Sequence, residues 1–346
     1  MKSLIKKKVS IFYLPLTMIG TYLVSYFFIR ATISTPSASG SINSTTKETA
    51  SVSPSQCDYT IRRLDGFTFI RPLLFVEQNC ESSRYLGLKA DIENLINEFK
   101  ANNEVTSASV YFRDLRRSEW VSYNDTEKYY PGSLMKLVLL IAYLREDEMM
   151  PGTLDKHMTL ARPVSTDKHP VYLSKSIEIG KSYPVRELLR YMISYSDNNA
   201  AYLLAENVNQ TIFTKTITDM GMDAPAMNAL NYPVTAHQYS YFMRTVYNSS
   251  YLSINHSEFA AELLSTCDFT RGFTAGMPAE TKMIHKFGES GDPSGQQLHE
   301  SGIIYINDDA YLLTVMTKGK DMQQLPEVIR SIASLVYQHI SAEPGT

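Results

Sequence analysis

The sequence lacks a charge excess, a metal-binding spacing and an internal repeat, and each absence excludes a class of protein. Its 346 residues carry a formal net charge of -3, so they offer no basic face of the kind that nucleic-acid binding requires. The three cysteines show no Cys-x-x-Cys spacing, which argues against a zinc site. The hydrophobic content of 44% is ordinary for a globular protein. We therefore expect a monomeric globular protein without a metal, a cofactor or a nucleic-acid partner.

Charge is also absent from residues 9–29, which lie between a lysine-rich N-terminus and Arg30. A helix of this length is roughly 31 Å long, enough to cross the apolar core of a bilayer. The lysines in residues 1–8 predict a cytoplasmic tail, so the rest of the chain is expected outside the cell membrane. The alternative is a cleaved signal peptide, but its apolar region would usually be shorter, and no clear small-x-small cleavage site follows Arg30.

Two further segments precede the main domain. Residues 30–56 are rich in serine and threonine and have too few apolar side chains to form a core, so we expect a flexible linker of roughly 25 Å. Residues 57–84 form a strand-rich extension with a turn signal at residues 65–66. Cys57 and Cys80 bracket this extension, and two states are open for them: a disulfide in an oxidising compartment, or two buried thiols.

Residues 85–342 carry strand patterns near both ends and helical patterns between them. Residues 86–100 and the segment from Leu325 onward place apolar side chains at helical spacing. The strand-like segments are residues 107–115, 119–124, 281–288, 302–306 and 311–317. We expect an α/β (α+β) domain in which both chain ends build one antiparallel sheet. Its N- and C-terminal helices should cover one face, and a central all-helical subdomain should occupy about residues 130–265.

A Ser-x-x-Lys pattern occurs at least four times, and its context distinguishes Ser133 and Lys136 from the other three. This pair follows a turn signal at residues 130–132 and opens an almost wholly apolar run, residues 134–144, which predicts a buried helix. The N-terminus of such a helix favours negative charge that develops at Ser133. Lys136 lies one turn on, where desolvation lowers its pKa and suits it to take a proton from Ser133. The alternative is an N-cap serine with a lysine that extends to the surface.

Two later motifs supply possible partners. Ser196-Asp197-Asn198 lies between two predicted helices, and by itself such a loop is typical of a helix cap. His285-Lys286-Phe287-Gly288-Glu289 ends a predicted strand. A lysine followed closely by glycine at that place lets a ligand approach the backbone.

Together and in this order, the three motifs resemble those of the penicillin-recognising serine hydrolases, especially the class A β-lactamases. The resemblance covers about residues 85–340. It implies that Ser133 is the acylated nucleophile and that Lys136 is its general base or proton relay. It further implies that Ser196, helped by Lys286, passes the proton to the leaving nitrogen.

The resemblance also implies how substrate is held. Asn198 is expected to bind both the substrate and Lys136. The backbone N–H groups of Ser133 and Glu289 are expected to form the oxyanion hole, usually a large contribution to catalysis of this kind, with Gly288 beside them.

The chain departs from the family pattern at two places. Phe287 replaces the hydroxyl residue that helps to hold a substrate carboxylate, and Glu289 adds a negative charge beside it. One lost hydrogen bond of this kind weakens binding by roughly 1.5–3 kcal/mol. Residues 224–233 contain no acid, although class A β-lactamases carry a water-activating glutamate in this loop. We therefore expect slow deacylation, with Asp223 and His237 as substitutes that nothing in the sequence favours.

Three functions remain open at this stage. The first is a membrane-anchored, extracytoplasmic, class A β-lactamase-like hydrolase that acts on β-lactams. The second is a carboxypeptidase or transpeptidase that acts on D-alanyl peptides of the cell wall, which the anchor would place nearby. The third is a non-catalytic wall-binding or signalling protein, and the presence of every nucleophile-site residue argues against it.

Overall fold

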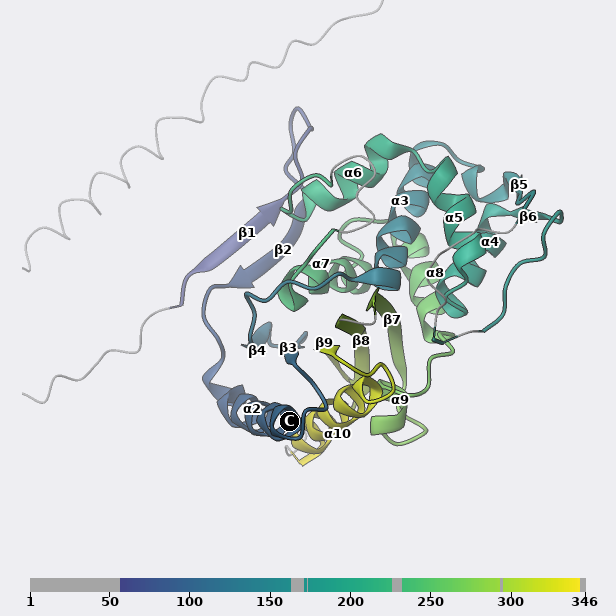
Figure 1. The fold of residues 1–346 in the computed structure, drawn as a ribbon. Helices are drawn as coiled ribbons and strands as arrows, with labels where there is room; N and C mark the ends of the chain where they lie inside the picture. The colour runs from purple at the N-terminus through teal and green to yellow at the C-terminus, as the bar shows by residue number, and fades with distance from the viewer. Residues whose placement is uncertain (1–56, 163–170, 173, 226–231, 293–294, 343–346) are drawn as a thin grey trace, which may run out of the picture. The chain divides into compact units, whose positions relative to one another are not determined.

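The computed structural model describes most of the chain that follows the predicted linker (Figure 1). The described residues are 57–162, 171–172, 174–225, 232–292 and 295–342. Among them, no helix combines the length and the apolar character needed to span a bilayer. The predicted membrane segment, residues 9–29, and the linker lie outside the described residues.

A five-stranded antiparallel sheet forms the centre of the domain, in the order β4-β3-β9-β8-β7 (Figure 1). The strands are β3 (Ser107–Asp114), β4 (Glu119–Tyr123), β7 (Met283–Asp292), β8 (Gly295–Ile306) and β9 (Asp309–Gly319). β3 pairs with β9 along its whole length. Strands from the two ends of the domain therefore form one sheet, which confirms the predicted arrangement.

Two long helices, α2 (Leu86–Ala101) and α10 (Leu325–Ala342), pack against each other below the sheet (Figure 1). α2 buries Leu88, Ile92 and Ile96, whose spacing of four places them on one side of the helix. α10 lies against β8 and β9. These contacts confirm the predicted terminal helices as the cover of one sheet face.

The helical subdomain lies between the N-terminal and C-terminal strands in the sequence. Its helices are α3 (Met135–Met149), α4 (Val185–Ser194), α5 (Asn198–Asn207), α6 (Gln210–Asp219), α7 (Ala236–Tyr247) and α8 (Ile254–Ser265). A short β5–β6 pair (His157–Thr159 and Ser182–Pro184) separates α3 from α4, and α9 (Phe273–Gly276) precedes β7. α3 is central, because it contacts α4, α5, α6 and α8 and buries every residue from 136 to 144.

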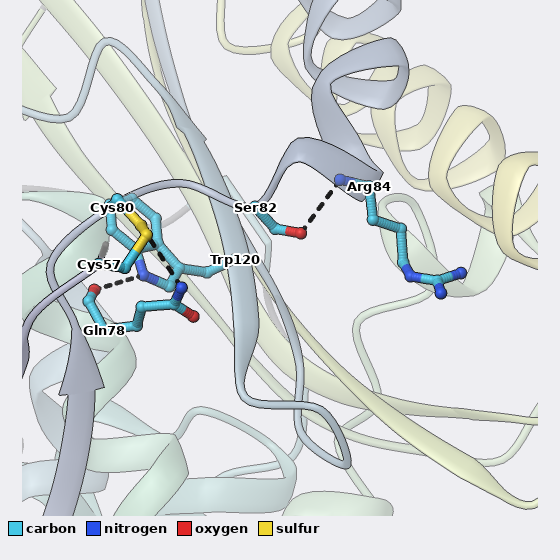
Figure 2. Close-up of a disulfide and its surroundings, with 6 residues drawn as sticks. All are labelled: Cys57, Gln78, Cys80, Ser82, Arg84 and Trp120. Atoms are coloured by element: carbon cyan, nitrogen blue, oxygen red, sulfur yellow. Dashed lines mark hydrogen bonds between the residues drawn. A yellow bond between two sulfur atoms is a disulfide. The ribbon is translucent and has the colours of Figure 1, made fainter. Parts of the chain in front are cut away.

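A separate hairpin precedes α2. It consists of β1 (Tyr59–Arg63) and β2 (Leu73–Gln78). Figure 2 shows that a disulfide joins Cys57 to Cys80 at its base, where the Cα atoms lie 5.7 Å apart. The indole N–H of Trp120 on β4 donates to the Gln78 carbonyl at 2.8 Å. The structure thus contains the disulfide rather than two free thiols, and a hydrogen bond ties the hairpin base to the sheet.

A buried ionic cluster links β2 to β3 and α7. It consists of Glu77, Arg113, His237 and Arg244, and we call it the hairpin junction. Glu77 accepts hydrogen bonds from Arg113 at 2.8 Å and from Arg244, and both arginines are almost completely buried. Burial by itself would raise the pKa of Glu77. His237, whose Nε2 lies 3.5 Å from the carboxylate, and the two guanidinium charges outweigh the effect of burial and hold the pKa at about 2. Glu77 is therefore ionised at neutral pH and neutralises one of the two arginine charges.

The strand predicted at residues 302–306 was too short, because β8 begins at Gly295. The added residues are largely polar, and Gln297, His299 and Glu300 are nevertheless buried. Each has a hydrogen-bond partner from outside its own strand. Polar composition concealed this half of the strand, because the partners come from distant parts of the sequence.

Candidate active site

Ser133 lies in a single 3₁₀ turn, Gly132–Leu134, that leads directly into α3. We call this segment the nucleophile turn. Gly132 has φ +53°, and a Cβ there would lie 2.1 Å from the Glu289 carbonyl oxygen. A Cβ on Gly288 would likewise collide with the backbone of the turn. The two glycines therefore allow β7 to contact the turn directly, which brings the backbone of Glu289 next to Ser133.

Tyr130, just before the nucleophile turn, is held by three side chains of β7 and β8. Its N–H donates to Gln297 Oε1 at 3.0 Å, and its carbonyl accepts from Ser290 Oγ at 2.6 Å and from His299 Nε2 at 3.1 Å. His299 Nδ1 accepts from the Thr317 N–H, so the ring proton resides on Nε2. Burial lowers the pKa of His299 to about 4, which keeps the ring neutral in this role.

Lys136 is buried one turn into the helical segment and is surrounded by acceptors from the loop before α5. Its Nζ donates to the Ser196 carbonyl at 2.6 Å and to Asn198 Oδ1 at 2.7 Å, and lies 3.2 Å from Ser196 Oγ. Burial, reinforced by the positive charge of Lys286, holds the pKa of Lys136 well below its usual range. Such an amine gives up its proton more readily and can then accept one from a neighbouring hydroxyl.

The Ser196-Asp197-Asn198 loop has a strained backbone and a buried anchor. Ser196 has φ +52°, a left-handed conformation that is uncommon for any residue but glycine. Asp197 caps α5 by accepting two backbone N–H groups at its start, those of Asn199 and Ala200. It also accepts from Ser176 Oγ and the Ile177 N–H. Asp197 therefore holds the loop in shape, while the residues on either side of it reach Lys136.

Lys286 on β7 is completely buried beside this group. Its Nζ donates to the Phe287 carbonyl at 3.1 Å and lies 4.2 Å from the centre of the Phe287 ring. Burial lowers the pKa of Lys286, although Asp268 and Glu300 nearby favour its charged form. Lys136 and Lys286 also repel each other, since the charge of Lys286 lowers the pKa of Lys136. The site thus contains two lysine side chains whose pKa values are both lowered from the usual range of lysine.

Phe287, which stands where the family pattern has a hydroxyl residue, is part of an aromatic cluster. Its side chain is buried and stacks on Phe269 with ring centres 4.3 Å apart. Tyr172 meets it edge-on at 6.0 Å. The ring also belongs to the hydrophobic core that α2 and α10 share with the sheet. Phe287 therefore contributes packing at this position and brings no hydrogen-bonding side chain to the site.

Glu289 extends from β7 toward the segment at residues 171–172. One of its carboxylate oxygens accepts the Val171 N–H at 3.1 Å. Burial raises the pKa of Glu289, although this N–H and the lysines Lys136 and Lys286 favour the charged form. A carboxyl group with a raised pKa thus lies next to the nucleophile turn. When this carboxyl group is ionised, it repels an anionic substrate.

His237, one of the two substitutes considered for the missing glutamate, lies in the hairpin junction. Its ring stacks on Tyr111 at 4.4 Å, and Nε2 lies 3.5 Å from a carboxylate oxygen of Glu77. Tyr239, two residues on and therefore on another side of α7, donates its hydroxyl to the Leu134 carbonyl at 2.9 Å. α7 thus contacts the nucleophile turn through Tyr239. His237 instead contacts Tyr111 and Glu77 at the hairpin junction. Residues 226–231 of the acid-free loop lie outside the described residues.

The structure brings Lys136, Ser196 and Asn198 into direct contact and places Gly288 and Glu289 against the nucleophile turn. Sequence reasoning did not find the residues that support this site, above all Tyr130 with its partners on β8 and Tyr172 with Phe269. Their separation in the sequence leaves no local pattern to detect.

The fold and the geometry together define a class of serine acyl-transfer proteins. In that class a serine precedes a buried helix, and a lysine one turn on contacts a Ser-x-Asn loop beside a sheet-edge lysine. A profile described as the beta-lactamase enzyme family matches residues 87–340. The chain belongs to this family of serine hydrolases. No curated protein sequence matches it significantly.

Solved structures with the same fold include β-lactamases and PBP-A. PBP-A in an acyl-enzyme complex with penicillin G matches with a TM-score of 0.61 and 18% identity, over 74% of this chain and 96% of that one. A class A β-lactamase from Mycobacterium abscessus matches with a TM-score of 0.62 and 18% identity, over 74% and 100%. A β-lactamase from Chitinophaga pinensis matches with a TM-score of 0.62 and 19% identity, over 72% and 99%. At these identities the likeness concerns the fold.

Proposed function

We propose that this protein is a membrane-anchored, extracytoplasmic serine hydrolase that is acylated at Ser133 by β-lactam amides and releases the acyl group slowly. The observation that carries the proposal is the environment of Lys136. Its amine is buried, its pKa is lowered, and it lies 3.2 Å from Ser196 Oγ. An uncharged amine in this position is suited to accept the proton of Ser133 and to pass it on through Ser196.

In the proposed mechanism, Ser133 Oγ attacks the carbonyl carbon of the amide while its proton moves to Lys136 Nζ. The oxygen of the tetrahedral intermediate accepts hydrogen bonds from the backbone N–H groups of Ser133 and Glu289. The proton then travels through Ser196 to the leaving nitrogen, the C–N bond breaks, and an ester on Ser133 remains. Asn198 positions the Lys136 amine throughout, consistent with their distance of 2.7 Å.

Slow release follows from the lack of an acid in residues 224–233 and from the location of His237 at the hairpin junction. The same observation favours a second candidate, a D-alanyl peptide carboxypeptidase or transpeptidase, in which water or the amine of a second peptide takes the acyl group from Ser133. The predicted anchor, residues 9–29, supports both candidates because it places the site near the cell wall.

Intact-protein mass spectrometry of the full chain after incubation with penicillin G tests the proposal. We expect one adduct with the mass of the antibiotic, located on Ser133, absent in Ser133→Ala and lasting minutes or longer. Release of D-alanine from a D-alanyl-D-alanine peptide would shift the assignment to the second candidate. Reaction of Ser133 with a fluorophosphonate but not with penicillin would overturn only the proposed substrate class. Reaction with neither reagent would overturn the proposal that the protein is a serine hydrolase.

A further inference from the structure

The β1–β2 hairpin presents apolar side chains to solvent. Phe69 in its connecting loop is 95% exposed, and Ile70 beside it is 58% exposed. Three strand residues add to this surface: Tyr59, Ile61 and Leu73. Single exposed apolar residues are common on proteins, but several on one protruding hairpin are typical of a surface that meets another apolar phase. We call the loop between the strands, residues 64–72, the hairpin tip.

The hairpin tip is an ordered structure. Arg71 donates through one nitrogen to the carbonyls of Phe67 at 2.6 Å and Ile70 at 2.9 Å. Arg63 donates to the carbonyl of Arg71 at 2.8 Å. These bonds satisfy three backbone carbonyls of the tip from within, and the Leu64 N–H donates to the Pro72 carbonyl at 2.9 Å. Each satisfied group lowers the cost of bringing the loop into an apolar medium.

The tip and the adjoining end of β1 together carry net positive charge. Arg62, Arg63 and Arg71 stand against Asp65 alone, which leaves two positive charges on residues 62–71. Exposed aromatic and aliphatic side chains next to arginines form the pattern of segments that lie at the interface of an anionic bilayer. The charge complements phosphate-bearing lipid headgroups, and the apolar side chains complement the acyl region below them.

The order of segments along the chain also indicates a membrane as the partner of the hairpin tip. The segment before the described residues includes the uncharged run 9–29, followed by a polar linker that enters the domain at Cys57. Cys57 is bonded to Cys80 at the base of the hairpin, so linker and hairpin start from one point of the domain. We propose that the hairpin tip docks on the anionic surface of the membrane that anchors the chain. This inference concerns the hairpin and is independent of the chemistry at Ser133.

The test uses the full chain reconstituted in vesicles of phosphatidylglycerol and phosphatidylcholine. Phe69→Trp places a reporter at the tip, and Ile254→Trp on α8, where Ile254 is 77% exposed, is the matched control. The emission of wild-type protein, which comes from buried Trp120, is subtracted. When brominated lipids replace the ordinary ones, we expect the tip reporter to lose about half of its emission or more, and the control to lose little.

Replacing phosphatidylglycerol with phosphatidylcholine should reduce the quenching of the tip reporter, since the arginines then lose their counter-charge. Equal quenching of both reporters, or none at the tip, overturns the proposal. So does protein that fails to float with the vesicles. A blue shift at the tip that depends on protein concentration without lipid would assign the surface to a second copy of the chain and also overturn it. The inference rests on the anchor of the proposed function, whereas labelling of Ser133 by a fluorophosphonate is measured separately. A failed docking test therefore leaves the proposed chemistry at Ser133 unaffected, and only failure to float would also count against the anchor.

Discussion

The protein buries two groups of cationic side chains, and they are handled in opposite ways. At the hairpin junction the cations are arginines, Arg113 and Arg244, and Glu77 between them has its pKa lowered to about 2. In the candidate active site the cations are lysines, Lys136 on α3 and Lys286 on β7, and burial lowers the pKa of both. At the junction a buried anion neutralises positive charge. In the active site the lysines have lowered pKa values, so each amine loses its proton more easily.

The difference follows from the chemistry of the two side chains. A guanidinium group cannot lose its proton in a protein, so burying it requires a partner of opposite charge. An ammonium group can lose its proton, so a buried lysine can become the neutral base that proton transfer needs. The arginine cluster therefore suits a structural joint, and the lysine pair suits a chemical site.

The largest expected effect comes from making the site resemble the junction. Lys136→Arg keeps a cation at this position but removes the ability to lose a proton. We expect acylation of Ser133 by penicillin G to slow by about a thousandfold, because general-base assistance is lost. The rate of adduct formation measured by mass spectrometry checks this. Arg113→Lys, the reciprocal change at the junction, should leave that rate nearly unaltered, and a comparable loss there would contradict the division of roles.

Removing the anion of the junction should affect stability instead. Glu77→Gln leaves two buried guanidinium groups without their counter-charge, and we expect the free energy of unfolding to fall by about 3–5 kcal/mol. Urea denaturation at pH 7 provides the measurement. Glu178→Gln, which breaks the exposed pair with Lys181, is the matched control and should change little. If both variants lose the same free energy of unfolding, the ion pairs of the junction do not contribute the stability assigned to them.

The stability contributions of His299, beside the nucleophile turn, and of Glu77, at the hairpin junction, should be lost over different pH ranges. Its pKa is about 4 in the folded protein against 6.5 for an ordinary histidine, so the unfolded chain binds a proton more readily between these values. Stability should therefore fall by about 3 kcal/mol as the pH drops from 6.5 to 4. Loss of the Glu77 contribution follows at lower pH, from 4.5 down to 2. Unfolding free energies measured at several pH values test this order.

A matched pair of variants assigns the upper transition. His299→Gln should flatten the slope between pH 6.5 and 4, whereas replacement of exposed His157 on β5 should leave it in place. An unchanged slope in His299→Gln would mean that another group binds the proton.

The smallest expected effect concerns the charge beside the nucleophile turn. Glu289→Gln keeps a side-chain oxygen for the Val171 N–H but removes a negative charge from the site. We expect acylation by penicillin G, an anion, to become about tenfold faster at neutral pH. A neutral fluorophosphonate serves as the control probe and should react at an almost unchanged rate. Equal acceleration of both reagents would point to altered access rather than to charge.

Much of this architecture could be predicted from local patterns. Apolar spacing located α2 and α10, and alternating or apolar runs located β3, β4 and β9 at nearly their observed positions. The almost wholly apolar run after Ser133 correctly indicated a buried helix. These patterns report burial directly, because most side chains that face a core are apolar whatever lies across from them.

Other features had no local pattern. The polar first half of β8 was missed, because Gln297 and His299 are satisfied by Tyr130, more than a hundred residues earlier. His237 was considered as a possible base, yet it stacks on Tyr111 at the hairpin junction. The packing of Phe287 on Phe269 and Tyr172 was equally invisible.

The sequence by itself determined the kinds of residue available for chemistry and their order along the chain: Ser133 and Lys136 on one helical turn, then the Ser196 loop, then Lys286 and Gly288 on a strand. The tertiary structure decided what each of them does. It buried Lys136 against Ser196 and Asn198, and burial is what lowers its pKa. A pKa depends on the solvent and the charges around a group, and these come from segments that only the folded chain brings together.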